Sequence, residues 1–572
     1  MKSKKYFIRC TSTILILLLL VACEDYLNRE LSTDLDYTQV TESYTYTGYR
    51  LSSIYSVLRS GFNVVDGAMM ASASDEAEHT LETSNVQMFN IGSWNPYSNP
   101  DVAWVEYYIG IRRVNQFLVS VDNINLDLYK FDPSPAQQAV YTSRLAEIKR
   151  WKYEARFLRA FFYFELVKRY GGVPLLTSAG SIIDDYGSIT RNTLTECLQF
   201  ITDECDSTAS ILPVTYAAAD LGRATKGAAL ALKSRALLYA ASDLFNTPSL
   251  ATGYAHPELI SLTGDRQVRW QAAADAAKSV IDLAGTGYQL STSYSGLFGT
   301  ATFSNAEVIF CRRNDATNSF EIANYPIGFY LGQSGTTPSQ NLVDAYEMTN
   351  GKLITEQDSE YDPQDPYINR DPRLAMTILT NNSMFKGRRI ESWQGGLDGK
   401  PIANATKTGY YLKKYLNADI NLITNTTSVH SWIFFRLAEI YLNYAEALNE
   451  CQPGHEDIEL YVNKVRQRSG VSMPALTTGL TQSEMRDKIR HERRIEFAFE
   501  DHRLWDLRRW MLASTHLATP LKGMHITKNT DGTFNYEVID VENRVFQSKM
   551  YLYPIPQNEI LIAGGLIQNP SW

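Results

Sequence analysis

The segment 432–510 most constrains what this chain can fold into, because its apolar residues recur at helical spacing. In 436–450 apolar side chains return every three or four residues, which predicts an amphipathic helix. The pair Pro453-Gly454 interrupts this stripe, and a second helical stripe follows as far as Ser469. Residues 436–469 therefore predict one helix–turn–helix unit of 34 residues, the length of a tetratricopeptide repeat, which gains stability by stacking on neighbours.

A third helix is predicted from about Ser483 to Trp510. Its segment 489–510 is crowded with Arg, Asp and Glu. We interpret these charges as ion pairs along and between helices rather than as a binding stripe. This interpretation leaves Phe499 and Trp505 for the hydrophobic core.

The rest of the chain contains further helical patterns, at residues 49–58, 102–119, 144–170, 194–212, 224–245 and 268–284. Together with the segment 436–510 they predict a mainly α protein, an array of about four tetratricopeptide-like helix pairs. Between them, 285–430 is rich in Gly, Asn, Thr and Tyr, which indicates an irregular, loop-rich subdomain with short strands. Residues 522–547 predict a hairpin around Asp531-Gly532.

Four ordered runs resemble the motifs of the SusD/RagB family of surface lipoproteins from Bacteroidetes. They are TPSQNLVDAYEMTNGK (337–352), RLAEIYLNYAEALNE (436–450), HERRIEFAFEDHRLWDLRRW (491–510) and YLYPIPQNEI (551–560). The resemblance implies a SusD-like helical fold and non-catalytic binding of a glycan without a cofactor. It also implies a partner, a SusC-like TonB-dependent outer-membrane transporter that receives the oligosaccharide.

The amino terminus carries the features of a bacterial lipoprotein signal. Basic residues precede the apolar run 14–20, which is shorter than the roughly 20 residues a membrane span needs. The sequence Leu-Val-Ala-Cys ending at Cys23 resembles a lipobox, in which Cys23 becomes the lipidated first residue. Glu24-Asp25 resembles a surface-export signal, so we expect a lipid-anchored outer-membrane protein facing outward. The alternative is an ordinary secretion signal with a chance cysteine.

These patterns divide the chain into five predicted parts. They are a signal peptide (1–22), a lipid-anchored tether (23–45), an N-terminal helical region with ligand-face loops (46–284), the loop-rich subdomain (285–430) and a C-terminal helical region (431–572).

The net charge and the cysteine spacing argue against two kinds of ligand, nucleic acid and zinc. The formal net charge of -9 argues against a nucleic-acid ligand, which requires a basic face. Beyond the tether, the cysteines are Cys197, Cys205, Cys311 and Cys451, and their spacing fits no zinc motif. We predict no metal site and favour buried free thiols, although the sequence leaves their pairing open.

The chain is rich in aromatic residues, with 35 Tyr, 23 Phe and 9 Trp. Sugar sites combine an aromatic ring, which stacks on the C–H face of a pyranose, with side chains that hydrogen-bond its hydroxyls. Two loops offer this mixture, 93–99 and 314–333, and Trp94 is the first choice as a platform. The full set of candidate glycan-binding residues is Asp75, Trp94, Asn95, Tyr97, Tyr325, Phe329, Tyr330 and Trp393.

Two other functions remain open at this stage. A helical array can serve as an adaptor that binds only protein. A glycoside hydrolase would need two carboxyls held about 5 to 9.5 Å apart, for instance Asp75 and Glu78, and sequence proximity does not show that geometry. Because no recognised catalytic motif occurs, we predict no catalytic residues and no enzymatic activity.

Overall fold

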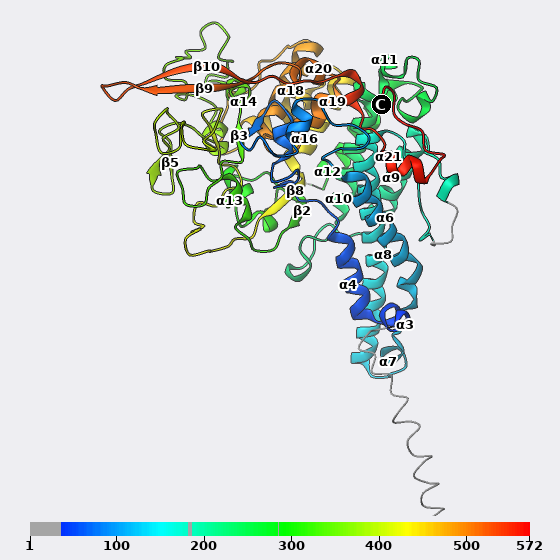
Figure 1. The fold of residues 1–572 in the computed structure, drawn as a ribbon. Helices are drawn as coiled ribbons and strands as arrows, with labels where there is room; N and C mark the ends of the chain where they lie inside the picture. Colours follow the sequence, from blue (N-terminus) through cyan, green and yellow to red (C-terminus); the bar gives the residue numbers. More distant parts are fainter. Residues whose placement is uncertain (1–35, 181–185, 284, 286) are drawn as a thin grey trace, which may run out of the picture.

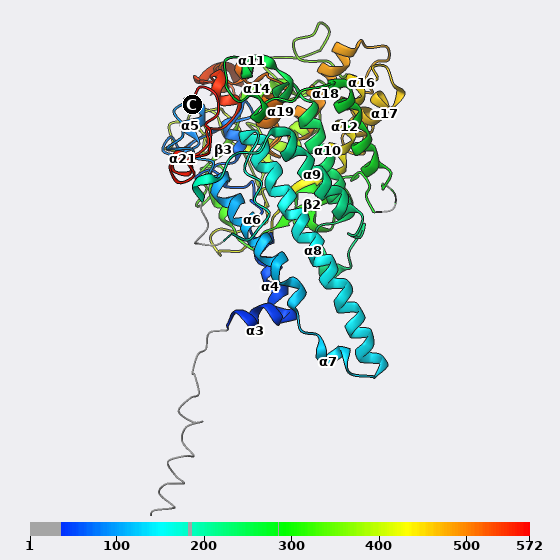
Figure 2. The same cartoon turned by 90° about the vertical axis from the view of Figure 1, so that its right-hand side faces the viewer.

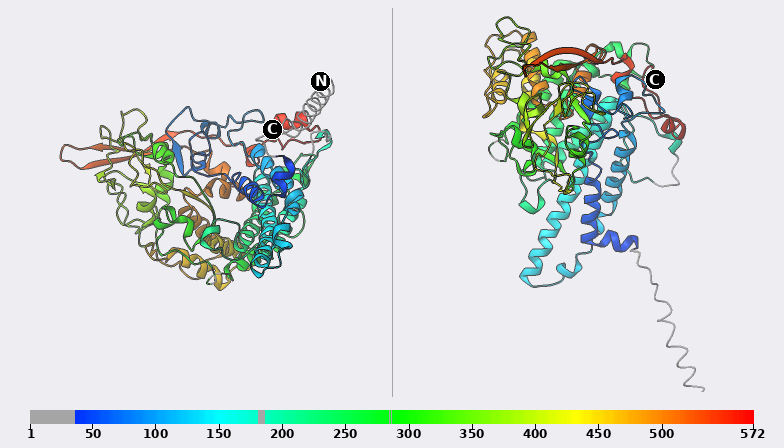
Figure 3. Two further views of the ribbon diagram at one scale, coloured as in Figure 1. Left: turned by 90° about the horizontal axis from the view of Figure 1, so that it is seen from below. Right: turned by 60° about the vertical axis from the view of Figure 1, so that its left-hand side comes forward.

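The computed structural model describes residues 36–180, 186–283, 285 and 287–572. The predicted signal peptide and Cys23 lie outside these residues. Figure 1 shows a helical array on one side of the molecule and a loop-rich region on the other. Seen from below, the elements follow an arc that leads from the N-terminal helices to the loop-rich region (Figure 3).

The longer helices build the array and its C-terminal extension. They are α4 (Tyr44–Tyr55), α6 (Ala103–Ser120), α8 (Pro135–Tyr170), α9 (Leu194–Ala209), α10 (Lys226–Ala241), α12 (Arg266–Ile281), α16 (Leu437–Cys451), α17 (Glu456–Arg466), α18 (Gln482–Glu496) and α19 (Arg503–Arg509). Shorter helices lie in the connections: α3 (Tyr37–Glu42), α5 (Gln87–Asn90), α7 (Asp127–Lys130), α11 (Pro248–Ala251), α13 (Ser319–Asn324), α14 (Gln340–Ala345), α15 (Arg373–Thr377), α20 (Ala513–His516) and α21 (Gln557–Ile562).

The helices pack as stacked antiparallel pairs, which confirms the predicted mainly α array. Helix α8 packs on α9, α10 on α12, and α16 on α17, while α9 contacts α10 and α12 contacts α16. Small buried residues such as Ala228 and Ala231 let α10 approach its neighbours closely. Each pair thus buries its apolar face against the next, as the repeat pattern requires.

The strands are short and form antiparallel two-stranded ladders: β1 (Ala77–His79) with β3 (Thr336–Pro338), β2 (Val308–Arg313) with β8 (Ser431–Arg436), β4 (Ile378–Leu379) with β7 (Tyr411–Leu412), β5 (Met384–Phe385) with β6 (Arg388–Arg389), and β9 (Leu521–Lys528) with β10 (Phe534–Glu542). The last ladder is the hairpin predicted around Asp531-Gly532, and Gly532 has a φ of 88° there. In the described part of 285–430 every helix and strand is short. The boundaries of the predicted loop-rich subdomain stay a prediction.

The prediction of one helix from Ser483 to Trp510 is wrong. Helix α18 ends at Glu496, and a turn separates it from α19. In this turn Phe499 and Asp501 have left-handed φ angles of 62° and 63°. The turn brings Glu500 to 2.7 Å from both the Arg436 guanidinium and the Lys414 ammonium. The helical period of the sequence cannot reveal this turn, because distant residues stabilise it.

The charges of this segment form a buried ion network, which confirms their interpretation as structural. Arg436, at the end of β8, lies 2.9 Å from Glu307, 2.7 Å from Glu496 and 2.7 Å from Glu500. Glu496 also pairs with Arg373 and Arg468, at 2.9 and 2.6 Å. The network therefore joins the loop-rich region to the C-terminal helices through fully desolvated charges.

Two further findings concern the cysteines and the membrane. Cys197, Cys205 and Cys311 are buried, Cys451 is partly buried, and all four are free. Within the described ranges, the helices are either too short or too polar to cross a membrane.

Replacing Arg436 tests the weight of the ion network. Arg436→Met leaves three buried carboxylates with one cation fewer, so we expect the free energy of unfolding to fall by about 3–5 kcal/mol. Urea unfolding followed by circular dichroism measures this change. The exposed Arg112 provides a matched control, since Arg112→Met should change stability by about 0.5 kcal/mol or less. Equal effects of the two substitutions would contradict the structural role of the network.

Candidate ligand-binding face

Three loops from distant parts of the sequence meet at one surface, which we call the three-loop face. It consists of residues 79–84, 326–334 and 391–407. The β1–β3 ladder joins the first two, and Thr80 extends it by donating from its amide and its hydroxyl to the carbonyls of Gly335 and Ser334, at 2.9 and 2.8 Å. The amide of Gly328 donates to Asp398 Oδ1 at 3.2 Å, which attaches the third loop.

Tyr330 is the exposed aromatic ring of this face, with 60% of its surface accessible. The loop that carries it is fixed by backbone hydrogen bonds from Gly332 to Phe329 and from Ser334 to Tyr325, both 3.0 Å. Leu331 has a φ of 59°, a conformation that is unfavourable for a branched side chain and that surrounding contacts must maintain. The ring is therefore presented to solvent by a rigid loop.

Asp398 supports the Tyr330 loop through the Gly328 amide, and it was not among the residues predicted from the sequence. This buried carboxylate makes a bidentate ion pair with Arg388, with both N–O distances 2.7 Å, and accepts from the Glu391 amide at 2.9 Å. The Arg388 guanidinium lies 3.9 Å from the Phe329 ring centroid. A Cβ on Gly328 would come within 2.5 Å of Asp398 Oδ1, so glycine is required there. An Asp-Gly pair in a loop gave no signal that distinguishes it from a simple turn.

The three loops of the face also carry exposed polar side chains. Exposed donors and acceptors from the three loops are Glu82, Gln333, Gln394 and Asn404. Lys407 bridges two carboxylates, with its Nζ 2.9 Å from Glu82 and 3.2 Å from Glu78. The half-buried ring of Trp393 lies in the third loop, with Lys528 Nζ 4.9 Å from its centroid. The face thus combines aromatic rings with hydrogen-bonding groups.

The prediction that Trp94 is an exposed platform is wrong. Its side chain is 2% accessible, and its ring centroid lies 4.9 Å from that of Trp572 and 5.0 Å from that of Tyr553. Both partners belong to the C-terminal segment, so packing that the local sequence does not reveal has buried the ring. Neither face of the indole is free for a sugar.

Asp75 is also unavailable to a ligand, contrary to the prediction. It is buried, and its carboxylate lies 2.7 Å from Arg503 Nε and 2.9 Å from an Arg494 nitrogen. Although burial alone would raise the pKa of Asp75, these two guanidiniums hold it well below its usual range. Its negative charge is therefore neutralised by ion pairs within the protein and is not available to a ligand.

Three further predicted residues have structural roles. Tyr325 is buried, and its hydroxyl donates to the Asn417 carbonyl, so it is not a platform. Phe329 is half-buried beneath Arg388, which covers one face of its ring. Asn95 closes a turn by accepting from the Tyr97 amide at 2.9 Å.

Tyr97 is 81% exposed, but it lies in another neighbourhood from Tyr330. Next to it, the Pro96 carbonyl accepts from the Gln557 amide at the start of α21. Figure 1 shows α21 on the opposite side of the molecule from α13, which precedes the Tyr330 loop. The structure therefore places Tyr330 and Trp393 in two loops that Asp398 joins, and places Tyr97 in a separate neighbourhood beside α21.

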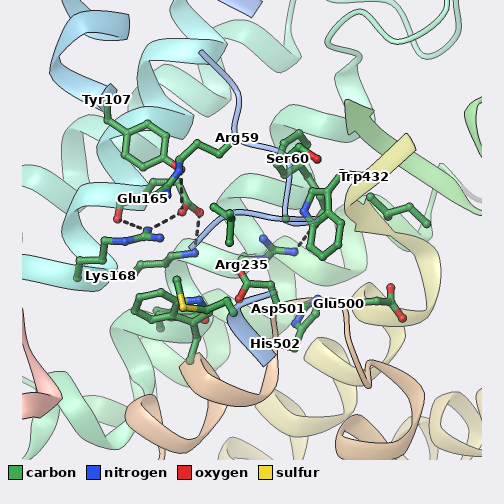
Figure 4. A pocket seen from close by; sticks show the side chains of 18 residues that line it. Arg59, Ser60, Tyr107, Glu165, Lys168, Arg235, Trp432, Glu500, Asp501 and His502 are labelled. Atoms are coloured by element: carbon green, nitrogen blue, oxygen red, sulfur yellow. Dashed lines mark hydrogen bonds and ion pairs between the residues drawn. The ribbon is translucent and has the colours of Figure 1, made fainter. Parts of the chain in front are cut away.

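A small polar cavity lies between α8, β8 and the turn before α19 (Figure 4). Lys168 and Arg169 line it, and both pair with Glu165, at 2.8 and 2.7 Å. The cavity measures about 50 Å³, which holds a few water molecules. Small-molecule sites usually measure about 300–1,000 Å³, so this cavity is too small for a sugar chain.

A larger groove of about 400 Å³ lies between α4 and residues 311–315. Its lining includes Leu51, Phe303 and Arg312. Phe303 is half-buried and has the Arg313 guanidinium 5.1 Å from its ring centroid. The groove has the size of a ligand site, but its aromatic rings, Phe303 and Tyr55, are both less accessible than that of Tyr330.

Comparison with known protein families gives two matches. The family model described as the SusD family matches residues 306–572. The model described as starch-binding associating with outer membrane matches residues 31–238. Together the two matches cover most of the chain, including all three loops of the face.

Individual relatives agree with the family matches. A SusD-like protein, P2, of Formosa agariphila is 25% identical over 486 residues, which cover 82% of this chain and 79% of that protein. A SusD-like protein of Bacteroides ovatus is 22% identical over 495 residues, with the same coverage of 82% and 79%.

Solved structures show the same fold. The crystal structure of a SusD-like protein from Bacteroides fragilis superimposes with a TM-score of 0.77 at 27% identity, covering 94% of this chain and 99% of that chain. A SusD-like carbohydrate-binding protein from the same species has a TM-score of 0.71 at 24% identity and covers 92% and 100%.

Glu76, beside Asp75, should make stability depend on pH. Burial, followed by the charge of Asp75, raises the pKa of Glu76 from 4.5 to about 8. The folded protein therefore keeps a proton that the unfolded chain releases, so the free energy of unfolding should fall as pH rises from about 4.5 to about 8. Glu76→Gln should remove this part of the decline, as measured by urea unfolding across that pH range.

The exposed Glu356 supplies the control for this experiment. Glu356→Gln should leave the pH dependence of the wild type unchanged. If Glu76→Gln and wild type show the same slope, Glu76 is ionised in the folded protein and the prediction is wrong.

Proposed function

Because this chain belongs to the SusD/RagB family, we propose that it is a lipid-anchored, non-catalytic glycan-binding protein of the outer membrane. The family model that describes starch binding and association with the outer membrane supports the ligand class and the location. Within this chain, the observation that carries the proposal is the exposed Tyr330 ring on a rigid loop.

The three-loop face has the chemistry that an oligosaccharide requires. A pyranose can stack its C–H face on Tyr330, with Trp393 as a second ring along the chain. Its hydroxyls then reach the amides of Gln333, Gln394 and Asn404, which can each donate and accept. Because the loops are fixed before the ligand arrives, little ordering entropy is lost on binding. Because stacking on one exposed ring and a few hydrogen bonds supply the binding energy, the expected affinity is modest.

The carboxylates of the face support binding without hydrolysis. Asp398 is held in a bidentate pair with Arg388, and Glu82 is paired with Lys407, which also pairs with Glu78 just before the first loop. A glycosidase needs one carboxyl that donates a proton and a second that acts as nucleophile or base. Incubating the protein with a bound glycan and finding shortened products would refute the non-catalytic proposal.

The proposed anchor and partner follow from the family and from the amino terminus. Cys23 would carry the lipid, and a SusC-like TonB-dependent transporter would receive the glycan from this protein. The alternative, an adaptor that binds protein alone, shares the helical array and lacks any need for Tyr330. Glycan binding by the purified protein separates these two functions.

Removing the Tyr330 ring tests the binding face. Stacking on an aromatic ring contributes about 0.5–1.5 kcal/mol, so Tyr330→Ala should weaken glycan binding by roughly 2- to 12-fold. Isothermal titration calorimetry with a glycan identified on an array provides the measurement. Tyr97→Ala is the matched control, because Tyr97 is at least as exposed and lies on the other side of the molecule.

Three results would contradict the assignment of the face. A loss caused by Tyr97→Ala would move the site to the neighbourhood of α21. An effect of Phe303→Ala, with Tyr330→Ala silent, would move it to the groove beside α4. Binding of no glycan at all would favour the adaptor.

Replacing the proposed lipid-bearing residue tests the anchor. Cys23→Ser abolishes the thioether to which lipid is attached, so the protein should move from the membrane fraction to the soluble fraction. Fractionation followed by immunoblotting measures the shift. Cys451→Ser is the control, and it should leave the protein in the membrane fraction. A membrane-bound Cys23→Ser protein would exclude the lipid as the principal anchor.

A further inference from the structure

The first half of α8 extends away from the body of the protein as a stalk (Figure 2). The stalk comprises α3, α7, the start of α4 and residues 135–147 of α8. Burial in α8 begins at Ile148, so about 20 Å of helix projects beyond the packed array. The amino terminus of the described chain leaves from α3 at the same end of the molecule.

The stalk is held together by specific contacts. The Arg144 guanidinium lies 4.3 Å from the Tyr44 ring centroid and 4.2 Å from that of Tyr129, which attaches α8 to α4 and α7. The Asn125 amide donates to the Glu42 carbonyl at 2.8 Å and joins α3 to the same unit. The stalk is thus a defined structure rather than a frayed helix end.

Its tip, residues 127–132, is equally well ordered. The Gln138 side-chain amide donates to the carbonyls of Tyr129, Lys130 and Asp132, at 3.2, 3.1 and 2.7 Å. The Asp132 carboxylate accepts from the Ser134 amide at 2.8 Å, just before α8 begins. These contacts satisfy backbone groups that would otherwise oppose entry into an apolar environment.

The ordered tip presents two large apolar side chains to the outside. Leu128 is 78% exposed and Phe131 is 70% exposed. They are three residues apart in a helical turn, so they lie on the same side. Exposing both on a rigid tip costs free energy unless another apolar phase covers them.

The short stretch of chain between Cys23 and α3 indicates that this apolar phase is the membrane. Twelve residues lie between Cys23 and Asp36, which precedes α3, so the thirteen Cα–Cα steps from Cys23 to Asp36 span at most about 45 Å. A lipid on Cys23 would therefore hold the stalk close to the membrane surface. The charged residues of the tip, Asp127, Lys130 and Asp132, include both signs, so recognition of an anionic headgroup is not favoured.

We propose that the stalk tip inserts Leu128 and Phe131 into the outer surface of the lipid bilayer. This proposal rests on the lipid anchor of the proposed function and adds a second, protein-made contact with the membrane. Two contacts fix the orientation of the protein, whereas a flexible tether alone leaves it free to turn.

A fluorescent probe at the tip tests the proposal. The lipidated full-length protein carries Leu128→Cys labelled with the dye NBD, in a Cys451→Ser background, and is placed in phosphatidylcholine vesicles. Insertion should shift the emission to shorter wavelength and slow the reduction of the dye by external dithionite several-fold. Thr530→Cys, at the exposed turn between β9 and β10, is the control and should be reduced rapidly.

Two additions sharpen the result. Phe131→Ser in the labelled protein should restore rapid reduction at position 128, because the second apolar anchor is lost. Adding phosphatidylglycerol to the vesicles should change nothing, because the contact is apolar.

Three outcomes decide against the proposal or separate it from the anchor. Equal reduction rates at positions 128 and 530 would overturn it. Protection that requires a co-reconstituted outer-membrane transporter would show that the tip contacts protein instead of lipid. Mass spectrometry of the N-terminal peptide reports lipidation independently. If the lipid is missing, protection of the probe in unlipidated protein mixed with excess vesicles would still support tip insertion, and rapid reduction there would refute it.

Discussion

The fold depends on a cluster of ion pairs whose charged side chains are almost completely buried. Arg436 ends the strand β8 and begins the helix α16, and its guanidinium contacts Glu307, Glu496 and Glu500. Glu307 precedes β2, Glu496 ends α18 and Glu500 lies in the turn before α19, so one cation fixes the mutual positions of the loop-rich region and the C-terminal helices. A buried ion of either sign without its partners would be strongly unfavourable, which makes the arrangement cooperative.

The loop-rich region is rigid for the same physical reason, although it has few regular elements. Side chains take the place of strand ladders there. Asp398 accepts hydrogen bonds from the amides of Gly328 and Glu391 and pairs with Arg388. A single buried carboxylate thus holds three segments in register. A surface built in this way can present Tyr330 in one orientation, which suits recognition of a ring by stacking.

The comparison of Trp94 with Tyr330 shows where sequence analysis of a site stops. Both residues lie in polar loops, and residue type favoured Trp94. Trp572 and Tyr553, more than 450 positions away in the chain, cover its indole ring. Asp75 is unavailable for a similar reason, because distant Arg494 and Arg503 form ion pairs with its carboxylate. Exposure is a property of contacts between distant segments, and a local pattern carries no information about them.

The sequence by itself determined the stacked helices, the β9–β10 hairpin and the family. Helical periodicity and turn residues act over a few positions, so they can be detected without coordinates. The tertiary structure decided the break between α18 and α19, the burial of Trp94 and Asp75, and the joining of the three loops of the face. Each of these depends on desolvation by residues remote in sequence, which becomes defined when the chain has folded.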